Sequence, residues 1–104
     1  MSRFVLSVDA NRDLDEIESY LEKLPNDPAA RGADAIVRTL RSIGKEPHLG
    51  APHSNLTRLL DVEVRSRLTL PYRIYYRLGS AMPEIIAVLH TARDSTTILA
   101  ERFQ

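Results

Sequence analysis

The spacing of apolar residues changes its period part-way along this chain of 104 residues. Between residues 10 and 44, apolar residues recur every three or four positions, which gives a helix one apolar face. Between residues 60 and 89 they alternate with polar residues or form a short unbroken run, and both patterns are typical of strands. Helical and strand patterns in separate blocks predict an α+β fold with helices packed on an antiparallel sheet.

Two amphipathic helices are predicted in the first half of the chain. The first covers about residues 10–23, with Asp9 at its N-cap. The second runs from Pro28 to Gly44, because Asp27 can cap it and proline suits a first helical turn. The short gap between the two helices predicts an antiparallel hairpin. The side chains expected in its core are Leu14, Ile17, Leu21, Ile36, Val37 and Leu40.

Four strands are predicted around this hairpin. One precedes the helices, and three follow them with short links, so the later three are expected to form an antiparallel meander. The last strand is an unbroken apolar run, which predicts an inner strand covered on both faces. The predicted strands are residues 3–8, 60–65, 72–78 and 85–89.

The remaining segments are predicted from their turn residues and length. Residues 44–58 hold two glycines, Gly44 and Gly50, and two prolines, which predicts a loop that crosses back to the sheet. Residues 91–104 are expected to form a short packed helix or a partly ordered arm. The length fits one domain, so the expected fold is a strand, a helical hairpin, a three-stranded meander and a short tail within residues 1–104.

Composition excludes several kinds of site. The chain has no cysteine, which excludes disulfides, thiolate metal sites and a cysteine nucleophile. His48 and His53 lie five residues apart in the loop with no cysteine and no nearby fixed carboxylate, so we expect solvated loop histidines and no metal. Ser66 and Ser95 lack the strained turn of a serine nucleophile. The glycines are isolated, so no phosphate-binding loop and no cofactor is expected.

Charge and the first residues bear on partners and location. The 14 basic and 14 acidic residues cancel, so the chain lacks the long-range positive field that attracts nucleic acid without sequence preference. Residues 1–30 hold seven acids and three bases, whereas residues 31–77 carry an excess of bases. The apolar run Phe4–Val8 is too short for a signal peptide core or a membrane span. We therefore expect a cytoplasmic protein without membrane association.

Polar residues are expected to gather on one face of the meander. Arginine side chains there could neutralise a phosphate, and a carboxylate or histidine could transfer protons, which is what a metal-free ribonuclease needs. The alternatives are an ordinary solvated face with cross-strand charge pairs, and a buried His90 held by a hydrogen bond beside Ile86 and Val88. The expected polar group comprises Glu63, Arg65, Arg73, Tyr75, Arg77 and His90.

Several short motifs occur in a fixed order along the chain. They are Val8-Asp9-Ala10, Asp13-Leu14 with Ile17 and Tyr20, Pro47 to Gly50, Val64-Arg65, Tyr72-Arg73-Ile74 with Tyr76-Arg77, and Val88 to Asp94. In this order and spacing the chain resembles toxins of the RelE/ParE superfamily from type II toxin–antitoxin modules. The resemblance covers nearly the whole chain, and the fold that it implies is the one predicted above.

The resemblance implies two possible mechanisms. RelE-like toxins cut messenger RNA in the ribosome, are strongly basic, and usually carry a tyrosine or histidine near the C-terminus. This chain has no net charge, only two lysines, and no tyrosine after Tyr76. ParE-like toxins poison DNA gyrase, and their last strand often ends in a histidine followed by an arginine, as His90 and Arg93 do here. The ParE-like branch is therefore favoured.

On this interpretation the chain is a toxin that binds a target such as DNA gyrase and is not an enzyme. A cognate antitoxin, folding as it binds, is expected to neutralise it by covering apolar surface that the hairpin leaves open. The resemblance implies Arg65 and Arg93 as candidate target contacts. Two alternatives stay open: a ribosome-dependent endoribonuclease using Arg65, Arg73 and His90, and a non-toxic interaction domain with the same fold.

Overall fold

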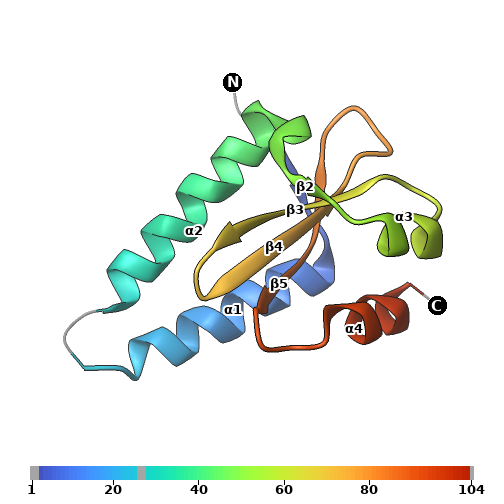
Figure 1. Ribbon diagram of the computed structural model, residues 1–104. Coiled ribbons are helices and arrows are strands. Elements are labelled where there is room, and N and C mark those ends of the chain that lie inside the picture. The colour runs from blue at the N-terminus through green and yellow to red at the C-terminus, as the bar shows by residue number, and fades with distance from the viewer. Residues whose placement is uncertain (1–2, 26–27, 104) are drawn as a thin grey trace.

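The computed structural model describes residues 3–25 and 28–103 and arranges them around a five-stranded sheet (Figure 1). The strand order is β1-β5-β4-β3-β2, with β1 parallel to β5 and the other neighbours antiparallel. The predicted α+β class and the antiparallel meander of β3, β4 and β5 are therefore confirmed. So is the inner position of β5, which lies between β1 and β4. The strands are β1 (Val5–Leu6), β2 (Ala51–Pro52), β3 (Val64–Thr69), β4 (Tyr72–Arg77) and β5 (Glu84–His90).

The two predicted helices are α1 (Val8–Glu22) and α2 (Pro28–Lys45). The Ser7 hydroxyl caps α1 by accepting a hydrogen bond from the Ala10 N–H at 3.0 Å. The expectation that Asp9 is the cap is wrong, because capping by Ser7 places Asp9 inside the first turn. The expected cap at Asp27 lies outside the described residues.

The prediction of a loop over residues 44–58 is wrong in its second half. This segment holds a 3-10 turn η1 (Pro47–Leu49), strand β2, and most of a short helix α3 (Ser54–Leu60). Leu56 anchors α3 because its side chain is only 2% exposed. Asp61 then ends the helix in the left-handed conformation with φ of 57°. The strand expected from residue 60 consequently begins at Val64.

Both faces of the sheet carry a hydrophobic core. On one face, Tyr76 and Ile74 of β4 pack with Leu40 and Ile43 of α2. On the other face, Tyr75 of β4 packs with Leu56 of α3 and with Leu99 of a C-terminal helix, α4 (Ser95–Arg102). Helices α3 and α4 contact each other, and Figure 1 shows them together, away from α2. The predicted solvated outer face of the meander is therefore wrong over much of its area, because α3 and α4 cover it.

The core between α1 and α2 follows the sequence pattern with one exception. Leu21, Ile36 and Leu40 are buried, and Leu14 with Ile17 packs against the same core. Val37 is 42% exposed, so its predicted place in the core is wrong. It lies one residue, or about 100°, around the helix from Ile36, which turns it toward the outer side of α2. Within the part of the chain that the structure describes, no helix combines the length and apolarity needed to cross a bilayer.

Candidate functional site

A groove opens between α1 and the end of β5. Its volume is about 450 Å³. A second hollow of about 280 Å³ continues from it toward the C-terminal end of α1 and the N-terminal half of α2. The two hollows share three residues, Tyr20 of α1 and the Pro71-Tyr72 pair at the start of β4. We call the first hollow the His90 groove; its lining includes Glu16, Tyr20, Pro71, Tyr72, His90 and Arg93.

His90 lies at the mouth of this groove with its side chain exposed. The alternative of a buried His90 is wrong, because His90 is the last residue of β5 and its side chain is exposed, although its strand partner Tyr72 belongs to the core. Its Nδ1 accepts a hydrogen bond from the Ala92 N–H at 3.1 Å, so the neutral ring carries its proton on Nε2. The ring meets Tyr72 edge to face, with centroids 5.9 Å apart. His90 is thus held in place and offers one N–H donor.

Arg93 stands in the turn between β5 and α4. The turn is fixed at two points: the Arg93 N–H donates to the His90 carbonyl at 2.9 Å, and Asp94 caps α4 by accepting from the Thr97 N–H at 3.2 Å. Hydrogen bonds from Thr97 lower the pKa of Asp94, so this cap is charged at neutral pH. The Arg93 side chain is exposed, and the ion pairs of the described residues do not include it. A rigid turn therefore presents an arginine beside His90.

Arg65 is in a different environment. Its Nε donates to Glu63 at 2.6 Å, and its Nη1 donates to the carbonyls of His48 and Gly50 at 3.0 and 2.8 Å. These bonds hold η1 and the following turn against the sheet. The turn is so close that a Cβ on Gly50 would overlap the Tyr76 hydroxyl, so glycine is required there. Most of the hydrogen-bonding capacity of Arg65 thus serves the structure.

Arg73 belongs to another cluster on the opposite face of the sheet. Its Nη1 donates to the Ser66 hydroxyl at 3.1 Å, and His53 Nε2 lies 2.6 Å from the same oxygen. Burial, and then the charge of Arg73, lower the pKa of His53, so its ring is neutral at neutral pH. The expectation that His53 is a solvated loop histidine is wrong, because its ring packs on Tyr75 at 5.3 Å. Ser66 is 1% exposed, so a substrate cannot reach it.

The three residues of the ribonuclease alternative do not meet. Arg65 pairs with Tyr76 and His90 pairs with Tyr72, so these two share the face toward α1 and α2. They lie on opposite sides of β4 and four β4 residues apart, which is a shift of about 13 Å along the strand alone. Arg73 points to the other face, beside Leu89. General acid–base catalysis requires groups within hydrogen-bond reach of one substrate, so these residues do not form one catalytic centre.

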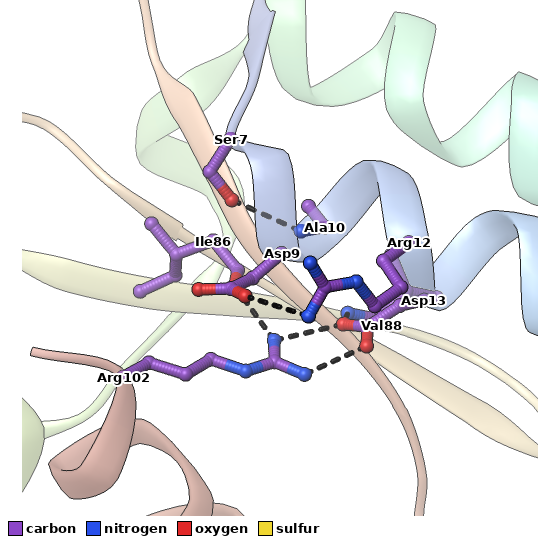
Figure 2. A network of polar contacts seen from close by, with 8 residues as sticks. All are labelled: Ser7, Asp9, Ala10, Arg12, Asp13, Ile86, Val88 and Arg102. Atoms are coloured by element: carbon purple, nitrogen blue, oxygen red, sulfur yellow. Dashed lines mark hydrogen bonds and ion pairs between the residues drawn. The ribbon is translucent and has the colours of Figure 1, made fainter.

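Figure 2 shows a buried ion pair that the sequence-based prediction missed. Arg102 of α4 makes a two-point contact with Asp13 of α1, at 2.7 and 2.9 Å, and its Nη1 also donates to the Ile86 carbonyl at 3.1 Å. Asp13 accepts a third bond from the Val88 N–H at 2.9 Å. Strand β1 pairs with β5 at Glu84 and Ile85. Beyond that pairing, the cluster provides hydrogen-bond partners for the Ile86 carbonyl and the Val88 N–H on the same edge of β5.

A signal for this contact was present in the sequence. Asp13 is three residues from Ala10 and four from Ile17, so it lies at the margin of the apolar face of α1, where an acid needs a partner. The partner itself is 89 residues away. The hydrogen bond with Asp13 raises the pKa of Arg102.

Comparison with known proteins supplies the family. The family model described as "ParE toxin of type II toxin-antitoxin system, parDE" matches residues 4–95. The chain belongs to the ParE toxin family. ParE membership implies a toxin of a toxin–antitoxin system with a cognate antitoxin as partner, and it confirms the resemblance on which the sequence-based prediction rested. The match includes β1 to β5 with His90 and Arg93 and ends where α4 begins. Among curated proteins, no sequence matches the chain.

Proposed function

We propose that this ParE-family toxin inhibits growth by binding and blocking DNA gyrase in the cytoplasm, without cutting RNA. The observation that carries the proposal is the separation of Arg65, Arg73 and His90, which lie on two faces and at two ends of the sheet. A bound inhibitor needs a complementary surface and no convergent acid and base. The absence of net charge over the whole sequence also favours a protein target over a polyanion.

The target contact is proposed at the end of β5. Arg93 and His90 stand side by side at the rim of the His90 groove, on a turn fixed by the Asp94 cap. A guanidinium on a rigid backbone loses little freedom on binding and is a frequent centre of interface energy. Arg65 is a second, lesser contact. In its described hydrogen bonds Nε and Nη1 donate within the chain, so Nη2 is the nitrogen left to donate to a partner.

The antitoxin is proposed to cover the same surface. Tyr20 is 57% exposed and lines the His90 groove. Leu70 is 75% exposed and lines the second hollow, which continues from that groove. A disordered antitoxin segment would gain free energy by burying these side chains as it folds. Covering the groove would also cover Arg93, so antitoxin and target would compete for one surface.

A supercoiling assay with purified gyrase tests the target. The wild-type toxin should inhibit supercoiling, and Arg93→Ala should need about tenfold more protein, equivalent to about 1.4 kcal/mol. Arg58→Ala is the matched control. Arg58 is exposed on α3, so this variant should inhibit supercoiling as strongly as the wild type does. If purified toxin left supercoiling unchanged while expression of the same chain in cells stopped growth, gyrase would be excluded as the target.

Expression in cells tests the toxin role itself. Expression alone should stop growth, and co-expression of the adjacent small gene should restore it, because an antitoxin is expected to be encoded beside its toxin. Normal growth at high soluble expression without that gene would favour the alternative of a non-toxic interaction domain.

A further inference from the structure

The segment that carries β2 and α3 is held to the rest of the molecule by few contacts. Both residues of β2 are exposed at the outer edge of the sheet, and α3 has seven residues, too few for a helix to be stable alone. The buried side chain of α3 is Leu56. Segments with few buried contacts open more readily than the core of a protein does. We call residues 51–60 the flap.

His53 holds the flap to strand β3 at the junction of β2 and α3. Its backbone N–H donates to the Val64 carbonyl at 3.0 Å, and its ring Nε2 lies 2.6 Å from the Ser66 hydroxyl oxygen. Within α3, the Thr57 hydroxyl accepts a hydrogen bond from the Val64 N–H at 2.9 Å. Of these contacts, the one made by the His53 ring depends on a group that can gain a proton near neutral pH.

The hydrogen bonds around Ser66 determine the protonation of this ring. Arg73 Nη1 donates to the Ser66 hydroxyl at 3.1 Å, and an arginine offers no acceptor in return. Ser66 is 1% exposed, so its own O–H must find an acceptor within the protein. His53 Nε2 is the acceptor within reach among the described hydrogen bonds. The ring is therefore neutral when the flap is closed, with its proton on Nδ1.

A proton on Nε2 would disrupt this arrangement. The ring would become a donor, so the Ser66 oxygen would meet two donors and its own hydrogen would lose its acceptor. Burial, and then the charge of Arg73, lower the pKa of His53 for the same reason. No carboxylate offsets the second charge among the described groups that face the ring from β3, β4 and α4, which are Ser66, Arg73, Tyr75, Ser95 and Thr96.

A hollow beside the ring gives a protonated His53 a place to move to. It has a volume of about 300 Å³ and lies between the start of α3 and the start of α4. Ser54 and Thr96 on its walls are exposed, so the hollow is open to water. A charged ring in this hollow would regain water at both of its N–H groups and would lie farther from Arg73. Opening of the flap therefore relieves the cost of protonation.

We propose that the flap is a pH-sensitive cover, which the neutral His53 ring holds closed against β3 and which opens when the ring is protonated. Opening breaks the contact between His53 and Ser66 and frees α3, while the helical hairpin and the meander of β3, β4 and β5 stay folded. Ser66 and Tyr75 are 1% and 6% exposed beside the closed flap, so opening uncovers them together with Arg73. Acid thus changes the surface on this side of the sheet, whatever the target of the toxin is.

Hydrogen exchange of the full chain, followed by NMR and corrected for the intrinsic exchange rate at each pH, tests the proposal. The amide of Thr57 donates to the His53 carbonyl at 2.9 Å and reports on α3, whereas the amide of Leu40 reports on α2. Thr57 should be at least about tenfold less protected than Leu40, because the flap opens without the hairpin. Its protection should fall by about tenfold between about pH 7.5 and about pH 5.5, since a freed histidine with a pKa of 6.5 is protonated over that range.

Two variants test the role of the ring and of the charge that faces it. His53→Gln keeps a hydrogen-bonding group that does not titrate, so the protection of Thr57 should no longer depend on pH. His48→Gln is the matched control, since His48 is exposed and this variant should keep the wild-type dependence. Arg73→Gln removes the facing charge while its amide can still donate to Ser66, so the fall in protection should be smaller than in the wild type. Circular dichroism shows whether each variant is folded.

Three results would each overturn the proposal. Equal protection of Thr57 and Leu40 would show that α3 opens only when the whole domain unfolds. Protection of Thr57 that does not change with pH in the wild type would remove the switch, and a full fall in His53→Gln would assign it to another group. If His53→Gln does not fold, Arg73→Gln decides, because a fall as large as that of the wild type would contradict the role of the paired charges.

Discussion

Replacing Asp13 by asparagine removes one charge from a buried pair while keeping the shape of the side chain. The Asp13 side chain is 6% exposed and that of Arg102 is 16% exposed, so the remaining guanidinium would be left without its counter-ion in a nearly dry site. Loss of one partner of such a pair costs about 3 to 5 kcal/mol. The amide that replaces the carboxylate would keep one oxygen for the Val88 N–H, so we expect Asp13→Asn to cost about 3 kcal/mol.

For a domain of this size that loss lowers the melting temperature by about 12 to 24 °C, measured by calorimetry or circular dichroism. Asp9→Asn on the same helix is the matched control. Asp9 lies 3.9 Å from Arg12 in an exposed pair and should cost less than about 1 kcal/mol. Adding Arg102→Met to Asp13→Asn should cost less than the sum of the single variants. If Asp13→Asn matched the control, the ion pair would not be what holds α4 to α1 and β5.

Two further predictions concern the core and the pH dependence of stability. Leu40→Ala should cost about 2 to 5 kcal/mol in a urea titration, since Leu40 is 5% exposed, whereas Val37→Ala should cost less than about 1 kcal/mol; equal midpoints would show that the burial of α2 is wrongly assigned. The pKa of His53 is lowered from 6.5 on folding, so the folded state binds fewer protons and stability should fall as the pH drops below about 6.5, until the folded pKa is passed. His53→Gln should flatten this slope, and the same change at the exposed His48 should not; a slope that survives His53→Gln would assign it to other groups.

The sequence predicted the long elements well because their signals are local. The four-residue spacing of Ile36 and Leu40 and a proline at Pro28 are enough to predict most of α2. The unbroken run in β5 correctly predicted an inner strand. Helix α3 was missed because its seven residues are too few for a clear period between turn residues and the strand that follows.

The candidate site was less predictable, because it depends on what covers each face of the sheet. Alternation along β4 assigned Arg73 and Tyr75 to one side correctly, but not whether that side meets water or helices. Arg65 was wrongly assigned to the same side, because its apolar neighbour Val64 packs with α3 and not in the core beneath α2. The contacts of His53 with Ser66 and of Asp13 with Arg102 join residues 13 and 89 positions apart, and no local pattern encodes such pairs.

This toxin is proposed to act by occupying its target and not by cutting RNA. The most direct measurement is the integrity of messenger RNA during translation in a purified system, with the toxin in molar excess over ribosomes. We expect intact message with the wild type and with Arg65→Ala, Arg73→Ala and His90→Ala alike. Cleavage by the wild type that falls by about two to three orders of magnitude in Arg65→Ala or His90→Ala would contradict target occupancy and establish the endoribonuclease.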